Sequence, residues 1–259
     1  MKKIGFFLIW AVFSFTLQAK TIEEWTESAD SKFQVNDYQG AISDYSKAIA
    51  LSPKMVDLYV ERAGVYQASN NFEKAIADWD IVISMKPDAD YYRIRMGLKQ
   101  KMGDTKGAAA DKAAIVQFYQ PELDTLTKLI AQEPDNPYHL IERGEIFIKA
   151  GEPKNAIKDW LIAANNPQND TRWNLYYKVA NSYAWDLELD QEAVKYFSIV
   201  INNSNEENNQ FLTDSYFERS SVYERMGLFK EACNDYLKAI ILQPDESEQG
   251  EMPKGCKKP

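Results

Sequence analysis

Arginine and aspartate recur in this chain at a fixed separation. In four places an arginine precedes an aspartate by 16 residues. The pairs are Arg62 with Asp78, Arg95 with Asp111, Arg143 with Asp159, and Arg219 with Asp235. Opposite charges held together could perform acid/base chemistry, because a neighbouring charge shifts the pKa of a catalytic group. Four copies of one catalytic centre are implausible, whereas a repeated sequence readily produces four copies of a structural ion pair. We therefore predict structural ion pairs.

Other groups able to do chemistry are sparse. The chain has one histidine, His139, and no cysteine is placed to build a zinc site or a catalytic triad around it. Phosphate-binding Gly-Lys-Ser/Thr loops, Gly-x-Ser-x-Gly elbows and His-Glu-x-x-His helices do not occur. We expect no catalysis, no cofactor and no metal. An enzyme with a pair of catalytic carboxylates stays an alternative, because such a pair leaves no local mark among 39 acidic residues.

Composition narrows the class of protein. The chain has 259 residues, of which 45% are hydrophobic and 13% aromatic, so it can bury a sizeable core. Its net charge is −9, and no basic stripe with interleaved aromatic residues is present. Because nucleic-acid binding depends on such positive charge, nucleic acid is not an expected partner.

The first 19 residues have the pattern of a signal peptide. Met1, Lys2 and Lys3 precede an uncharged and largely apolar run over residues 4–17, and Ala19 suits a signal peptidase. An uncleaved membrane anchor is the alternative, but the run is shorter than the roughly 20 residues of a spanning helix. We expect a bacterial protein that is periplasmic or secreted, and that has no stable membrane insertion after cleavage.

A repeated helical pattern runs through the rest of the chain. The anchors are six alanines. A bulky apolar residue follows five of them four places later, and an apolar residue follows all six seven places later. The six alanines are Ala41, Ala75, Ala108, Ala156, Ala193 and Ala232. This spacing forms one face of a helix. About 12 residues earlier lies a second helix face with small residues, clearest at Ala29, Ala63 and Gly144. The pattern predicts tandem antiparallel hairpins of about 34 residues.

The pattern resembles the tetratricopeptide repeat. The family's conserved skeleton is matched by Trp25, Ala29, Tyr38, Ala41, Tyr45, Ala48 and Pro53. The resemblance covers residues 22–244 and implies an all-α, right-handed superhelical solenoid of about six hairpins. An unusually long interval between Ala108 and Ala156 has room for one extra helix near 121–133, which reads like the second helix of a repeat that lacks its first.

We expect four parts in the chain. These are the signal peptide 1–19, repeats one to three over 20–120, the extra helix with repeats four to six over 121–245, and a C-terminal tail over 246–259.

The two cysteines lie at the end of this repeat array. Cys233 is on the face of the last hairpin where a further hairpin would pack, and Cys256 is in the tail. Because exported proteins form disulfides, we expect a Cys233–Cys256 bond that fastens the tail over the exposed end. In the alternative, Cys233 is a small core residue and Cys256 is a free thiol.

Proteins that this chain resembles bind peptides or helices of partner proteins on a concave surface lined by the first helix of each repeat. Carried over by position, the expected lining includes Phe33, Arg93, Tyr138, Glu145, Tyr177, Asn181, Trp185, Phe217 and Arg225. Some relatives grip a C-terminal carboxylate with a clamp of basic and asparagine residues. That clamp is not matched here, because Thr26, Asp30 and Glu61 stand where its first members belong.

Three of the expected lining residues are aromatic: Tyr177, Trp185 and Phe217. Aromatic side chains tend to dominate interface energies, so these would be suitable hot spots. Alternatively, they pack between neighbouring hairpins. One extra residue in the internal turn of repeat five leaves two registers open for Trp185.

These observations predict a non-catalytic, exported and monomeric scaffold that binds another protein or peptide through its concave face. Two alternatives remain. One is a structural solenoid that assembles end to end, and the other is an envelope protein that binds glycans or carries a carboxylate active site.

Overall fold

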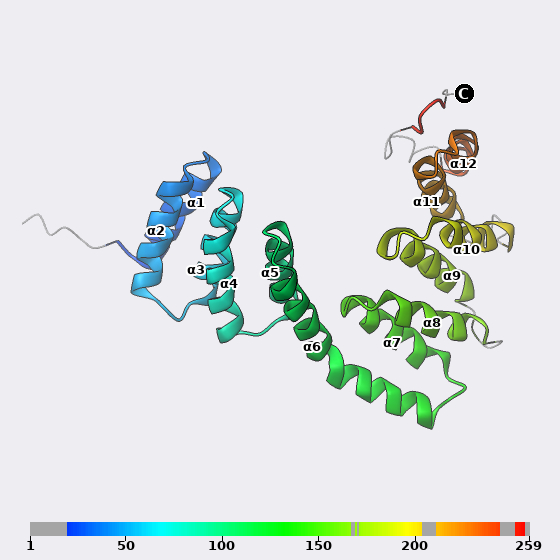
Figure 1. The fold of residues 1–259 in the computed structure, drawn as a ribbon, viewed down its shortest axis with the longest axis horizontal. Coiled ribbons are helices and arrows are strands. Elements are labelled where there is room, and N and C mark those ends of the chain that lie inside the picture. Colours follow the sequence, from blue (N-terminus) through cyan, green and yellow to red (C-terminus); the bar gives the residue numbers. More distant parts are fainter. Residues whose placement is uncertain (1–19, 167–168, 170, 204–210, 244–251, 257–259) are drawn as a thin grey trace, which may run out of the picture. The chain divides into compact units, whose positions relative to one another are not determined.

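The computed structural model describes residues 20–166, 169, 171–203, 211–243 and 252–256, and all the regular secondary structure in these residues is helical (Figure 1). The expected signal peptide lies outside these residues, as does most of the expected tail. Within them, no helix has the length and apolar character needed to span a membrane.

The chain divides into two compact units, residues 1–111 and 112–259. The first unit contains α1 (Ile22–Gln34), α2 (Tyr38–Leu51), α3 (Val56–Ala68), α4 (Phe72–Met85) and α5 (Ala89–Lys101). Helix α6 (Thr105–Gln132) includes residues of both units. The second unit continues with α7 (Pro137–Lys149), α8 (Pro153–Ala164), α9 (Arg172–Asn181), the π-helical turn η1 (Ser182–Asp186), α10 (Asp190–Asn203), α11 (Leu212–Arg225) and α12 (Phe229–Leu242).

Small residues allow the two helices of a hairpin to pack closely. Ala29 and Ala41, which face each other in the first hairpin, are both fully buried. In the hairpin of α7 and α8, Gly144 lies against Trp160, and a methyl group on Gly144 would be only 2.3 Å from the indole Nε1. A larger residue at Gly144 would therefore force the helices apart.

This close contact predicts opposite effects for two glycine substitutions. Gly144→Ala is expected to lower the free energy of unfolding by about 1–3 kcal/mol, because the added methyl group overlaps the Trp160 ring. Gly64→Ala, inside α3, is expected to raise it by roughly 0.5–1 kcal/mol, because nothing lies within 4 Å of the new methyl group. Urea denaturation of the two variants checks this. Equal effects would show that Gly144 is not a close contact.

A residue with left-handed backbone geometry lies in the turn of each hairpin. In five hairpins this residue is asparagine or glycine, which tolerate positive φ. The residues and their φ angles are Asn36 (62°), Asn70 (58°), Gly103 (75°), Gly151 (75°) and Gly227 (77°). The hairpin of α9 and α10 has Glu188 (53°) instead.

The extra residue of repeat five lies inside its first helix, not in the turn as we expected. The left-handed residue comes seven places after Ala63 in repeat two but eight places after Ala180 in repeat five. From there to the anchor alanine the distance is five residues in both repeats. The π-helical turn η1 lies in the lengthened segment, and a π turn accommodates one residue more than an α turn.

Residues 121–132 are helical, as the sequence predicts, but they do not form a separate helix. They continue α6 without a break, although Pro121 lies inside it. A proline removes one backbone hydrogen bond from a helix, which is why the sequence indicated a boundary there. Leu123 and Leu126 in this continuation are buried and pack with Ile146 of α7. The continuation thus packs against α7 as the second helix of a preceding repeat would.

The four arginine and aspartate pairs each join the two helices of one hairpin. Arg62 donates from Nε to Asp78 Oδ2 at 2.8 Å and from Nη2 to Oδ1 at 2.7 Å. The other three pairs have the same two-pronged geometry, with distances between 2.5 and 3.1 Å. Every aspartate is almost fully buried. Desolvation alone would raise the pKa of Asp111, but hydrogen bonds from Arg95 and Lys99 outweigh it and lower the pKa.

Each of these arginines also donates a hydrogen bond from Nη1 to a residue of the helix that precedes its own hairpin. Arg62 donates to Ser46 Oγ at 2.9 Å, and Arg95 donates to Asp80 Oδ1 at 2.6 Å. Arg143 donates to Thr127 Oγ1 at 3.1 Å, which lies in the continuation of α6. Arg219 donates to Ser198 Oγ at 2.6 Å in the same way. The arginine therefore connects neighbouring repeats as well as the two helices of its own repeat.

Repeat one has a variant of this connection that the sequence analysis missed. Asp44 stands three residues after its anchor alanine, like the other four aspartates, but Ser28 takes the place of the arginine. Ser28 Oγ donates to Asp44 at 2.7 Å, and Lys32 and Lys47 both form ion pairs with the same carboxylate. Burial acts to raise the pKa of Asp44, but these donors hold it far below its ordinary value. The available signal was the aspartate that stands three residues after five of the six anchor alanines.

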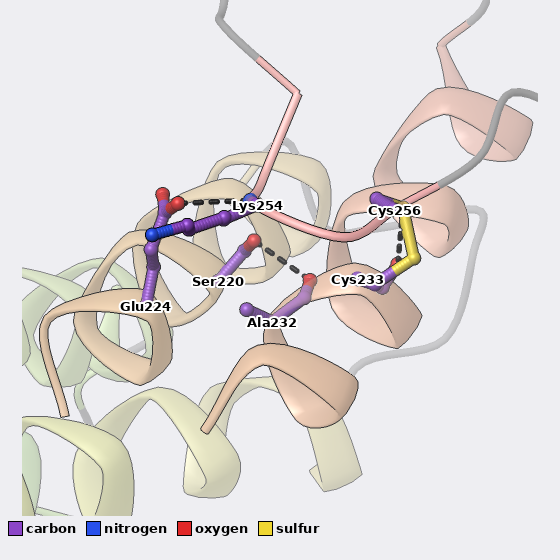
Figure 2. Close-up of a disulfide and its surroundings, with 6 residues drawn as sticks. All are labelled: Ser220, Glu224, Ala232, Cys233, Lys254 and Cys256. Atoms are coloured by element: carbon purple, nitrogen blue, oxygen red, sulfur yellow. Dashed lines mark hydrogen bonds between the residues drawn. A yellow bond between two sulfur atoms is a disulfide. The ribbon is translucent and has the colours of Figure 1, made fainter. Parts of the chain in front are cut away.

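The end of the last hairpin is covered by residues 252–256. Figure 2 shows the Cys233–Cys256 disulfide, which closes a loop with a sequence separation of 23. The Lys254 backbone N–H donates to Glu224 Oε1 at 2.9 Å, and Pro253 is buried. This segment is therefore attached to both α11 and α12.

Candidate protein-binding surface

The expected concave lining residues lie on the first helices of the hairpins. Phe33 and Arg93 belong to the first unit, on α1 and α5. The second unit holds the other seven: Tyr138 and Glu145 on α7, Tyr177 and Asn181 on α9, Trp185 in η1, and Phe217 and Arg225 on α11. The contacts that bring several of these together are all in the second unit.

Trp185 is the most exposed of the three aromatic hot-spot candidates, with 48% of its surface accessible. Its position is nevertheless fixed by two contacts from α11. The indole Nε1 donates to Glu218 Oε2 at 3.0 Å, and the Arg225 guanidinium lies 4.7 Å from the ring centroid. Arg225 is itself held by Asp190, through Nε at 2.9 Å, and by the Ala184 carbonyl at 2.9 Å. A large aromatic side chain is thus held in one orientation while still facing solvent.

Tyr177 and Phe217 take part in packing. The ring of Tyr177 lies 6.1 Å from Phe197 and 5.2 Å from Phe211, measured between centroids. Phe217 makes an edge-on contact with Tyr236 of its own hairpin at 5.8 Å. Both rings are half-buried. Much of the surface of Tyr177 and Phe217 is therefore used in packing, as the alternative interpretation predicts. Trp185 leaves more of its surface accessible to a partner.

Two carboxylates lie beside these aromatic residues on α11. Burial raises the pKa of Asp214. Burial also raises the pKa of Glu218, and the Asp214 charge adds to this effect although the Trp185 hydrogen bond opposes it. Burial likewise raises the pKa of Tyr177, and both carboxylates contribute. The three groups therefore lie within electrostatic reach of one another.

A cavity of about 590 Å³ adjoins the Trp185 ring. Its lining combines apolar groups with charged ones: Trp185, Leu187, Ile148, Gly151 and Pro153, two basic residues, Lys112 and Lys154, and two acidic residues, Glu152 and Asp186. A second cavity of about 440 Å³ lies between α6 and α7 and includes Glu145. The first cavity, next to an exposed aromatic ring, has the volume to receive a side chain of a bound polypeptide.

The remaining lining residues are placed separately. Glu145 of α7 forms an ion pair with Lys178 of α9, so it helps to connect two hairpins. Tyr138 is 57% exposed at the start of α7. In the first unit, Arg93 pairs with Asp90, and Phe33 packs against Tyr38 with 6.0 Å between ring centroids.

The first unit presents carboxylates where a carboxylate-gripping clamp would need basic residues. Burial raises the pKa of Glu61, and the charges of Asp30 and Asp57 raise it further. Tyr45 donates its hydroxyl hydrogen to Asp30. This acidic character disfavours an acidic peptide tail as the ligand.

His139 does not belong to this surface cluster. Its Nε2 lies 3.0 Å from Glu133 Oε2 and 3.2 Å from Asn136 Nδ2, near the start of α7. In the part of the chain that the structure describes, no three histidine, cysteine or acidic residues are grouped to hold a metal ion.

The sequence analysis missed Glu218 as a member of the Trp185 cluster. Glu218 is 33 residues away in sequence and falls between the positions that the repeat pattern assigns to the concave face. The available signal was the extra residue in repeat five, which lies in the segment that forms the π-helical turn carrying Trp185.

Two family models match the chain, and both describe a tetratricopeptide repeat. One matches residues 26–90, which contain most of the hairpins α1/α2 and α3/α4, and the other matches residues 213–246, which contain α11/α12. The chain contains tetratricopeptide repeats. The resemblance drawn from the anchor alanines is confirmed, and so is the all-α helical-repeat fold.

Several tetratricopeptide repeat proteins are similar to most of this chain. Hsp70-Hsp90 organizing protein 3 of Arabidopsis thaliana is 33% identical over 217 residues, which are 82% of this chain and 35% of that protein. Hsp70-Hsp90 organizing protein 1 of Glycine max is 24% identical over 233 residues, or 86% and 36% of the two chains. The chain spans about a third of the length of these curated relatives.

Solved tetratricopeptide repeat structures are also similar. YrrB, described as a TPR protein with an unusual peptide-binding site, is 20% identical with a TM-score of 0.40, covering 78% of this chain and 94% of its own. A tetratricopeptide repeat protein from Parabacteroides merdae is 17% identical with a TM-score of 0.43, covering 85% and 79%.

Proposed function

We propose that this protein is a non-catalytic scaffold that binds a partner protein or peptide on the first-helix face of its second unit. The observation that carries the proposal is Trp185, whose exposed ring is held by Glu218 and Arg225 beside a cavity of about 590 Å³. Binding costs less when the anchor side chain is already ordered. Tryptophan is also among the residues that contribute most to binding energy.

The relatives support a role in protein interaction. Two of them are named Hsp70-Hsp90 organizing proteins, a name that describes the organisation of other proteins. We do not propose that this protein binds the same ligands as those relatives, because Asp30 and Glu61 are acidic where the carboxylate clamp requires other residues. The proposed partner is therefore a different polypeptide, bound by a different set of side chains.

We further propose that the protein acts in a bacterial envelope or outside the cell, as a monomer. The basic start and apolar run of residues 1–19 support export. A disulfide between Cys233 and Cys256 suits an oxidising compartment. The residues attached over the last hairpin oppose end-to-end stacking of solenoids.

Affinity capture with a Trp185→Ala variant tests the proposal. The wild-type protein from Lys20 onward is expected to retain a partner from the native envelope fraction. Trp185→Ala is expected to weaken binding by about 30-fold, which corresponds to a hot-spot loss of about 2 kcal/mol. Calorimetric titration with the captured partner measures this change.

Phe118→Ala is the matched control, because Phe118 on α6 is 45% exposed and does not contact the Trp185 cluster. It should bind like the wild type. If Trp185→Ala binds as tightly as Phe118→Ala while both remain folded by circular dichroism, the proposed surface is wrong.

A further inference from the structure

The two carboxylates of α11 near Trp185 have the same charge and lie on the same side of the helix. Asp214 and Glu218 are four residues apart, so their side chains are neighbours on the helix surface. Two negative charges at this spacing destabilise a helix unless a cation lies nearby. A cation, from within the protein or from a bound partner, would relieve this repulsion.

Three cations of α11 and α9 already have other partners. Arg219 binds Asp235 and Ser198. Arg225 binds Asp190 and the Ala184 carbonyl while stacking on Trp185. Lys178 pairs with Glu145. No lysine or arginine of the described residues forms an ion pair with Asp214 or Glu218, and Glu218 receives only the neutral indole N–H.

The surroundings of the two carboxylates favour a cation over water. Asp214 and Glu218 are both half-buried, and this burial raises the pKa of each carboxyl. Tyr177 and Trp185 lie beside them, and aromatic faces attract ammonium and guanidinium groups. A charged pair with restricted access to water is also stronger than an exposed one.

The cavity between α6 and α7 is also lined mainly by acidic side chains among its charged groups. Glu122, Glu142 and Glu145 all line it, together with the apolar side chains of Leu126 and Ile146. The positive charges at its edge are Lys149, which lines the cavity, and Lys178, which is paired with Glu145. Acidic groups thus outnumber basic ones in the lining of this cavity.

We infer that the partner presents a basic segment to this face, with a lysine or arginine side chain that binds Asp214 and Glu218 beside Trp185 and an adjacent apolar side chain that enters the cavity lined by Ile148. This inference rests on the proposed function, because it specifies the ligand of the same surface. Complementary charge determines which partner is selected, and the Trp185 ring and the cavity supply apolar contact.

Selection from a phage-displayed library of random dodecapeptides tests the inference. Peptides enriched on the wild-type protein are expected to contain lysine and arginine at least twice as often as the unselected library. Representative peptides should bind at least tenfold more weakly to an Asp214→Asn/Glu218→Gln variant, in which glutamine keeps an acceptor for the Trp185 N–H. Their affinity should also fall as salt is raised.

The matched control neutralises two carboxylates outside this surface. Glu73→Gln/Glu231→Gln changes exposed residues on α4 and α12 and gives the same net charge as the test variant. The selected peptides should bind this control like the wild type. A tenfold loss in the control as well would overturn the inference, because overall charge and not Asp214 and Glu218 would then select the ligand.

Two further outcomes separate the inference from the proposed function. Peptides that lack an excess of basic residues but lose binding in Trp185→Ala would overturn the basic-ligand inference and leave the binding surface intact. If no peptide is enriched, or if the enriched peptides bind Trp185→Ala unchanged, the proposed surface fails and the inference fails with it.

Discussion

Replacing Arg62 with leucine is expected to lower the free energy of unfolding by about 3–5 kcal/mol. The guanidinium compensates the charge of Asp78, whose side chain is only 5% exposed. Removing it leaves a buried carboxylate without a cation and also breaks the 2.9 Å contact to Ser46 of the preceding hairpin. Urea denaturation followed by circular dichroism measures the loss.

A double variant determines whether the loss comes from the uncompensated charge. Arg62→Leu/Asp78→Leu removes both charges, and replacing a complete buried pair by apolar residues is often nearly neutral. We therefore expect the double variant to be more stable than Arg62→Leu alone. The hairpin of α9 and α10 supports this expectation, because it folds with Val179 and Tyr196 at the equivalent positions, counted from Ala180 and from the anchor Ala193. A double variant less stable than the single one would contradict it.

Removing the disulfide is expected to lower the free energy of unfolding by about 3 kcal/mol. The Cys233–Cys256 bond restricts the unfolded chain by closing a loop with a sequence separation of 23. Cys233→Ser/Cys256→Ser should therefore unfold at a lower temperature than the wild type, and added dithiol reductant should destabilise the wild type only. Differential scanning calorimetry under both conditions checks this.

The oxidation state of the cysteines is tested separately. After alkylation without reductant, the mass of the wild-type protein should show no modified cysteine. Two alkylated cysteines would mean that the thiols are free. Light scattering of the double-serine variant also tests the end-capping role, because exposure of the last hairpin is expected to give a mass that increases with protein concentration. A concentration-independent mass would argue against that role.

The four arginine and aspartate pairs show how a repeated spacing allows a contact to be predicted from the sequence. Arg62 and Asp78 could be matched without any structure, because the same separation occurs four times and a repeat places equivalent residues in equivalent surroundings. The hydrogen bond from each arginine Nη1 to the preceding repeat could not be predicted in this way. Its partner lies in the preceding helix layer, at separations of 16, 15, 16 and 21 residues, and is serine, aspartate or threonine. No single spacing or residue type identifies it.

Helix boundaries were less certain where local signals conflicted. Pro121 is a strong signal for a helix end, yet α6 continues through it. The packing of Leu123 and Leu126 against Ile146 is one interaction available to offset the lost hydrogen bond. Tertiary packing commonly outweighs local preference in this way.

The sequence by itself determined the tandem hairpins, the small residues between their helices and the paired charges, because each is encoded by a short spacing that recurs. Only the tertiary structure decided the surroundings of Trp185. One extra residue forms a π turn, and this turn lets the indole reach Glu218, 33 residues further along the chain. Such a contact depends on the angle at which one helix meets another, which no local pattern records.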